Sequence, residues 1–128
     1  MKPDVAEAIE ELKRAFPSSA VTSDEDGQGG TYVFVETVDI GTRFVPSTTW
    51  MGGQITALYP YSDIYPVFID AAVRRADGRE FAAPITNGHN FASRPAIQIS
   101  RRNNQAQNCP QTAVAKFMKI LDFLEKLP

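Results

Sequence analysis

The chain has 128 residues but only one cysteine and one histidine. A lone cysteine excludes an internal disulfide and a multi-cysteine metal site, so we expect no structural metal. The sequence also lacks a glycine-rich phosphate loop, a Ser-His-Asp set and a pair of convergent carboxylates. The sequence therefore contains no motif that indicates a hydrolase or a nucleotide-dependent enzyme, and we expect no cofactor.

An excess of either charge is also missing, because 13 basic residues face 15 acidic ones and the net charge is −2. Such a balance gives no general attraction for phosphate polymers, and the only adjacent arginine pairs are Arg74-Arg75 and Arg101-Arg102. We therefore expect no nucleic-acid partner. No apolar run reaches the roughly 18 residues that a membrane span needs, and residues 1–16 lack the apolar centre of a signal peptide. The sequence thus predicts a cytoplasmic protein without a membrane partner.

What is present is the composition of a globular protein, with 43% hydrophobic and 22% charged residues, both signs interspersed. Residues 1–128 are therefore predicted to form a single domain. Apolar residues at helical spacing predict an N-terminal helix from Pro3 to Phe16 and a C-terminal helix from Pro110 to Leu127. In the second helix the predicted apolar stripe leaves Lys116 on the solvent side.

The segments between these helices are rich in β-branched and aromatic residues. Residues 31–38 and 41–45 are predicted to form a hairpin, and residues 54–60 and 66–75 supply two more strands. This order predicts an α+β fold in which a meander of about four antiparallel strands is flanked by the two helices. The predicted core contains Val5, Ile9, Leu12, Phe34, Phe68, Ile69, Ile97, Phe117, Leu121 and Leu124.

Several short motifs occur in a recognisable order between Tyr59 and Leu124. Tyr59-Pro60 and Pro66-Val67-Phe68 frame a turn, Gly-His-Asn-Phe follows at 88–91, and Asn-Cys-Pro opens the last helix. Together they resemble the ubiquitin-conjugating enzyme (UBC) family, including its bacterial members and its catalytically silent variants. In that family a Tyr-Pro turn precedes a strand, and a His-Pro-Asn loop precedes the thioester cysteine by a short fixed step.

The resemblance implies roles for the residues that match. His89 and Asn90 stand where the His-Pro-Asn loop would be, and the Asn90 amide would stabilise the oxyanion of an attacked thioester. Counting eight residues on from Asn90 leads to Gln98, which has no nucleophile that could carry an acyl group. The resemblance therefore implies a silent variant that binds a ubiquitin-like protein or its activating enzyme. In the alternative interpretation His89 and Asn90 are polar turn residues.

Cys109 supports a second function class. Because it directly precedes Pro110, we expect it at or just before a helix N-terminus, where the helix dipole favours the thiolate form. It could then serve as an unorthodox acyl carrier of an active conjugating enzyme. The alternative is a half-buried cysteine that acts as a small hydrophobe.

Five residues are candidates for partner binding. Arg101 and Arg102 either lie in a solvated loop or present guanidinium forks to carboxylates of a partner. Tyr61 and Tyr65 either pack in core and turn or act as interface anchors. Trp50 is expected in a flexible linker between strands, where it either plugs the edge of the core or stays exposed for a partner. A third function class, an unrelated small-ligand-binding α+β domain, also remains open, and the sequence does not predict the oligomeric state.

Overall fold

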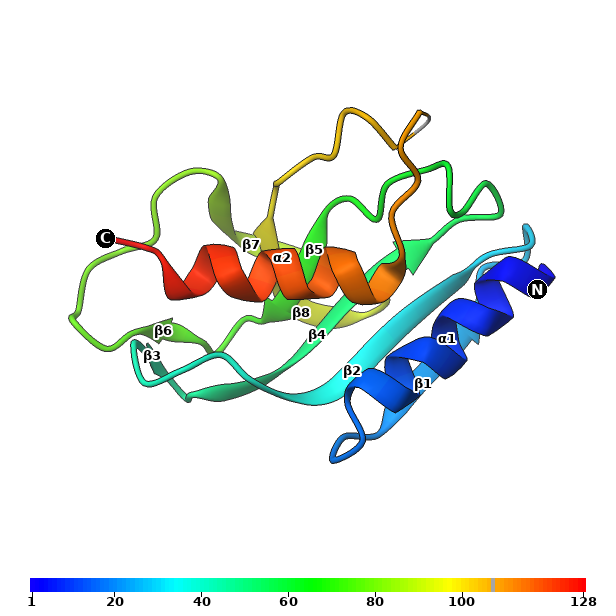
Figure 1. The fold of residues 1–128 in the computed structure, drawn as a ribbon. Coiled ribbons are helices and arrows are strands. Elements are labelled where there is room, and N and C mark those ends of the chain that lie inside the picture. The colour runs from blue at the N-terminus through cyan, green and yellow to red at the C-terminus, as the bar shows by residue number, and fades with distance from the viewer. Residues whose placement is uncertain (107) are drawn as a thin grey trace.

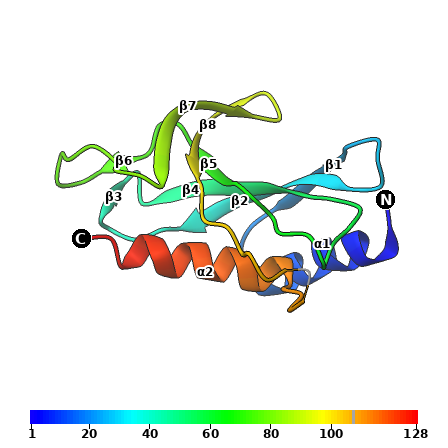
Figure 2. The same ribbon diagram turned by 90° about the horizontal axis from the view of Figure 1, so that it is seen from above.

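Two helices lie on one face of an antiparallel sheet in the computed structural model, which describes residues 1–106 and 108–128 (Figures 1 and 2). Helix α1 spans Pro3–Ala15 and buries the apolar stripe that contains Val5, Ile9 and Leu12. Its start at Pro3 suits proline, whose missing N–H needs no partner in the first helical turn. Helix α2 spans Ala113–Glu125 and packs beside α1. The α+β class is therefore confirmed, with both helices on the same side.

The main sheet has six strands in the order β1-β2-β4-β5-β8-β7, and every neighbouring pair is antiparallel. A separate two-stranded ribbon joins β3 and β6. The strands are β1 (Val21–Glu25), β2 (Thr31–Asp39), β3 (Phe44–Val45), β4 (Thr48–Ile55), β5 (Val67–Asp70), β6 (Arg74–Arg75), β7 (Ile85–Phe91) and β8 (Arg94–Ile99).

A meander of four antiparallel strands is present, but it is only part of the sheet, and its first strand, β1, was not among the predicted strands. Strands β1, β2, β4 and β5 follow one another in space as they do in sequence. The chain then passes one strand position before β7 begins, and β8 returns to fill the gap between β5 and β7. The prediction of about four strands missed this hairpin, because its polar segment 86–90 lacks the apolar alternation that marks a half-buried strand.

Two local strand predictions were wrong, and a third, residues 66–75, is divided between β5 and β6, which lie in different sheets. Residues 41–45 do not form a hairpin with 31–38, since β2 pairs with β4 and only Phe44–Val45 is extended, against β6. Residues 54–60 are not a strand of their own, because β4 ends at Ile55 and a turn follows. Turn chemistry explains the second error, since Leu58-Tyr59-Pro60 carries a proline that cannot donate to a ladder.

The inner core fills the space between the sheet and the two helices. Nine of the ten predicted core residues are buried, and Leu121 is partly buried against them. Phe117 of α2 is fully buried at the centre of this layer. The predicted burial is therefore confirmed except at Leu121, but Phe34 and Phe68 belong to a second core on the other face of the sheet.

Helix α2 begins later than predicted and is rotated relative to the predicted stripe. The Thr112 hydroxyl accepts a hydrogen bond from the Ala115 N–H at 3.1 Å, which caps the helix and places its first residue at Ala113 rather than Pro110. Lys116 points inward and is 4% exposed, in place of the solvent-facing position that the apolar stripe indicated.

The opposite face of the sheet carries a second, aromatic core. Alternation along β2, β4 and β5 turns Phe34, Trp50 and Phe68 away from the helices, and the β7–β8 hairpin rises on this side (Figure 2). Phe91 near the hairpin tip stacks on Phe68 at a centroid distance of 4.6 Å. A side chain at Gly52 would meet the Phe91 ring at 3.1 Å, so glycine in β4 allows this close approach.

An ion pair fixes the hairpin tip to β2. Arg94 donates two hydrogen bonds to the carboxylate of Glu36, at 2.7 and 2.8 Å, and its guanidinium lies 3.8 Å from the centroid of the Phe34 ring. The hydrogen bonds from Arg94 lower the pKa of Glu36 below its usual value. The tip itself turns through Ala92 and Ser93 with φ of +47° and +70°, as in a type I′ turn.

Candidate functional site

Two loops lie side by side at the N-terminal end of α2 (Figure 1). The first, residues 56–66, joins β4 to β5, and the second, residues 100–106 and 108–112 in the described part of the chain, joins β8 to α2. We call these loops, together with the adjoining part of α2, the loop surface. Four of the five residues predicted to bind a partner lie on it or at its edge, namely Tyr61, Tyr65, Arg101 and Arg102.

A buried ion pair joins the two loops to the helix. The ammonium of Lys116 on α2 lies 3.0 Å from the carboxylate of Asp63, and their side chains are only 5% and 10% exposed. Lys116 also donates to the Arg101 carbonyl oxygen at 2.6 Å, and Asp63 accepts the Asn103 N–H at 2.6 Å. A buried charge is tolerated only when it is paired and hydrogen-bonded, so this network holds both loops in one arrangement.

Tyr59 makes a further connection between the first loop and the helix. Its hydroxyl accepts a hydrogen bond from the Ala113 N–H at 2.9 Å, which satisfies a donor of the first helical turn. The ring is 7% exposed, and burial raises the pKa of its hydroxyl. The Tyr-Pro sequence thus has a structural role in this chain: it docks the loop on the start of α2.

The two arginines of the second loop rest on aromatic rings. The Arg102 guanidinium lies 3.9 Å from the centroid of Tyr65, and that of Arg101 lies 4.5 Å from Phe123 on α2. Stacking orients a guanidinium while leaving its N–H edge available to a ligand. Both residues are exposed, so the geometry allows them to contact a partner.

The first loop also presents apolar side chains to solvent. Leu58 is 72% exposed and Tyr61 is 58% exposed. Tyrosine and arginine are enriched at protein interfaces, where large side chains anchor in pockets of the partner. The loop surface therefore combines two exposed apolar side chains with two oriented cations.

His89 and Asn90 lie elsewhere and do not form a loop. Both belong to strand β7, where His89 pairs with Ala96 and Asn90 with Pro95. The His89 Nε2 lies 2.9 Å from the Thr86 hydroxyl, across a bulge in the strand. The expectation that they form a loop or turn was wrong, because the turn of this hairpin lies at Ala92 and Ser93 instead.

Cys109 is exposed and is not part of helix α2. Its backbone N–H donates to the Gln105 carbonyl oxygen at 2.7 Å, and it precedes the capping residue Thr112 by three positions. Cys109 therefore precedes the helix, as expected, but it lies four residues before the first helical residue, Ala113. Asn90 sits at the tip of the β7–β8 hairpin, whereas the loop to Cys109 leaves the other end of β8, so the fold does not bring these two residues together.

Trp50 is an interior residue of β4 and not part of a linker. It is 8% exposed and packs edge-on against Phe34, with centroids 5.5 Å apart. The glycines that follow it, Gly52 and Gly53, indicated flexibility in the sequence. In the structure they are buried strand residues whose missing side chains make room for neighbours.

Sequence reasoning missed the two residues that organise the loop surface. Asp63 was treated only as part of a turn, and Lys116 was assigned to solvent. The sequence offers one sign of the buried pair, which is that Lys116 stands alone between the apolar residues Ala115 and Phe117. An exposed helix position often has the same neighbours, so this sign does not distinguish the two cases.

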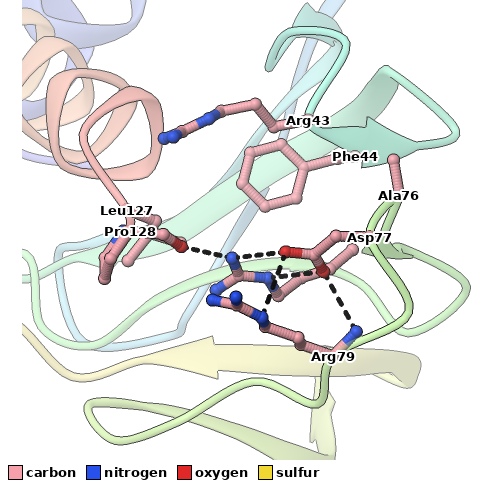
Figure 3. A pocket seen from close by; sticks show the side chains of 8 residues that line it. Arg43, Phe44, Ala76, Asp77, Arg79, Leu127 and Pro128 are labelled. Carbon is pink, nitrogen blue, oxygen red and sulfur yellow. Dashed lines mark hydrogen bonds and ion pairs between the residues drawn. The ribbon is translucent and has the colours of Figure 1, made fainter.

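Away from the loop surface, a hollow of about 290 Å³ lies near the C-terminal end of α2 (Figure 3). Arg75 donates to both oxygens of Asp77, at 2.9 and 3.1 Å, and to the Pro128 carbonyl oxygen. These hydrogen bonds from Arg75 lower the pKa of Asp77. Arg43 donates to the Glu125 carbonyl oxygen at 2.6 Å. Because Arg75 and Arg43 are already engaged, we interpret this hollow as the junction between the β3–β6 ribbon and the helix end.

No protein-family model, curated protein or solved structure matches the chain. In the described part of the chain no helix combines the length and the apolar character that a membrane crossing requires.

Proposed function

We propose that this chain is a catalytically silent UBC-like protein that binds a ubiquitin-like protein or its activating enzyme through the loop surface. The observation that carries this proposal is the buried pair between Asp63 and Lys116, which fixes two loops as a prepared surface. A surface that is ordered before binding loses less conformational entropy when a partner docks.

The residues at the positions where the UBC resemblance implies catalytic groups support a catalytically silent variant. Gln98 lies on β8, where its side-chain amide donates to the Ser100 hydroxyl at 2.9 Å, and it offers no thiol. Asn90 pairs with Pro95 at the start of β8, whereas Cys109 lies in the loop that leaves the other end of that strand, so the Asn90 amide is not placed to stabilise an oxyanion formed at Cys109. Binding without thioester transfer needs neither residue.

The side chains of the loop surface support protein binding. Leu58 and Tyr61 provide apolar area, and Arg102, held over Tyr65, provides a fixed donor at its border. This arrangement is typical of an interface with apolar anchors and a polar rim.

An adduct assay tests the silent character. The protein is incubated with the ubiquitin-like protein and activating enzyme of its own organism and ATP, and the products are separated with and without thiol reductant. We expect no reductant-sensitive adduct. A shifted band that disappears with reductant and in Cys109→Ser would overturn the proposal and make Cys109 the acyl carrier.

A binding assay tests the surface. By isothermal titration calorimetry we expect one of the same two proteins to bind, and binding to weaken in Arg101→Ala/Arg102→Ala and in Leu58→Ala/Tyr61→Ala. Met118→Ala is the matched control, because Met118 is also exposed but lies on α2 outside both loops. Equal affinities of all variants, or no binding by either protein, would contradict the proposal.

A further inference from the structure

A groove runs between the second loop and the exposed side of α2, with a volume of about 680 Å³. Arg101 and Arg102 line its loop wall, and Lys119, Phe123 and Lys126 line its helix wall. It is distinct from the exposed apolar side chains Leu58 and Tyr61, which do not line it.

The groove is locally positive although the whole chain carries a net charge of −2. Of its five cationic side chains, Lys116 is paired with Asp63 and Lys126 with Asp122, the latter at 3.0 Å. The other three cations are Arg101, Arg102 and Lys119. Among the residues that the structure describes, none of these three has a carboxylate within ion-pair distance. Each can therefore accept an anionic group from outside.

Hydrogen bonds to the buried pair Lys116 and Asp63 fix the backbone of the second loop, which forms one wall of the groove. The Arg101 carbonyl oxygen accepts the Lys116 ammonium, and the Asn103 N–H is bound to Asp63. The Arg101 guanidinium rests on the Phe123 ring. The backbone and the charged group of Arg101 are thus positioned by separate contacts, which lowers the entropy lost when a carboxylate binds.

Amide side chains line the same groove. Asn103, Gln105 and Gln111 contribute to it, and the Asn103 amide donates to the Gln111 carbonyl oxygen at only 3.3 Å, which is a long hydrogen bond. Side-chain amides carry both donors and acceptors, as the backbone of an extended peptide does. The lining therefore matches a peptide chain with carboxylates better than it matches a bare anion.

We propose that this groove binds an extended acidic peptide segment of a partner protein, with carboxylates at Arg101 and Lys119. The inference deepens the proposed function, because it rests on the loop surface being a protein-binding surface. Charge complementarity favours a peptide over nucleic acid, since three cations confined to one groove of a net acidic protein do not form the basic stripe that a phosphate backbone requires.

Fluorescence anisotropy with short labelled peptides tests the inference without any cascade protein. The probes are an alternating Glu-Asp octapeptide, its Gln-Asn counterpart and a single-stranded oligonucleotide with the same number of negative charges. We expect the acidic peptide to bind more tightly than both others, and its binding to weaken with added NaCl. In Arg101→Gln/Lys119→Gln its affinity should fall about tenfold or more, the equivalent of roughly 1.4 kcal/mol.

Arg74→Gln/Arg79→Gln is the control, because it removes the same charge at exposed positions that do not line the groove. Its affinity for the acidic peptide should equal that of the parent protein. Equal binding of the neutral peptide, tighter binding of the oligonucleotide, or equal loss in both double variants would each overturn the acidic-peptide groove. Acidic-peptide binding together with no binding to the ubiquitin-like protein or activating enzyme would sustain the groove and refute only the proposed function.

Discussion

Lys116 and Asp63 are separated by 53 residues in the chain, yet their charged groups meet at 3.0 Å beneath the loop surface. This contact connects the first loop, the second loop and α2, because the same two side chains also bind the Arg101 carbonyl and the Asn103 N–H. The pair therefore governs both stability and the shape of the proposed binding site.

Lys116→Met should lower the free energy of unfolding by about 3 kcal/mol, because it leaves the Asp63 carboxylate nearly buried without its cation. Urea denaturation followed by circular dichroism measures this change. Lys119→Met is the control, since Lys119 is exposed on the same helix, and it should change stability by no more than about 0.5 kcal/mol. The double variant Asp63→Leu/Lys116→Met should recover most of the loss, and failure to do so would mean that the pair contributes more than compensation of buried charge.

Phe117→Ala should destabilise the protein by about 3–5 kcal/mol, because it empties a fully packed aromatic site of the inner core. Its neighbour Met118 is 42% exposed, so Met118→Ala should cost far less. Chemical denaturation of the two variants under one set of conditions gives the comparison. A loss below about 1 kcal/mol for Phe117→Ala would place that face of α2 in solvent.

Ala92→Asn/Ser93→Gly should stabilise the β7–β8 hairpin by about 1 kcal/mol. Both positions have positive φ, which costs an ordinary residue about 1–2 kcal/mol and which asparagine and glycine adopt more readily. The midpoint of thermal unfolding should rise accordingly. Ala72→Gly, at an exposed loop position without positive φ, should lower the midpoint instead, and a rise in both variants would exclude turn strain as the cause.

The ion pair between Glu36 and Arg94 should make stability depend on acid pH. Because hydrogen bonds from Arg94 lower the pKa of Glu36 in the folded state, the unfolded chain binds more protons near its usual pKa of about 4.5. The stabilisation is present above that pH and is lost as the pH falls through the lowered folded value. Urea unfolding should therefore show Glu36→Gln less stable than the parent protein at about pH 7, with the difference shrinking below about pH 4. A difference that stays constant over this range would contradict the assignment.

Local signals in the sequence were sufficient for α1 and for most of the core. Helix α1 was predicted from Pro3 to Phe16 and is observed from Pro3 to Ala15, because an uninterrupted apolar stripe and a following proline define both ends. Phe34 and Phe68 were assigned to one core but belong to the second, aromatic core on the other face. A continuous apolar run, as in β2, indicates that both faces of a strand are buried, but it does not show what covers each face.

The residues that we propose to bind a partner were partly predictable, whereas the network beneath them was not. Arg101, Arg102, Tyr61 and Tyr65 could be chosen by residue type, because exposed arginine and tyrosine favour interfaces. The burial of Lys116 depends on a partner from a distant loop, and no periodicity within α2 carries that information. For the same reason His89 was misplaced: the hairpin forms by pairing with β8, although its own segment is polar.

The chain has a single tryptophan, and Trp50 belongs to the aromatic core beneath the β7–β8 hairpin, away from both helices. Its indole emission therefore reports whether the hairpin is docked on the sheet, while the far-ultraviolet helical signal reports α1 and α2 on the opposite face. The protein thus has two native optical probes that sample different sides of one sheet. Their coincidence or separation during unfolding would reveal whether the two cores melt as one cooperative unit.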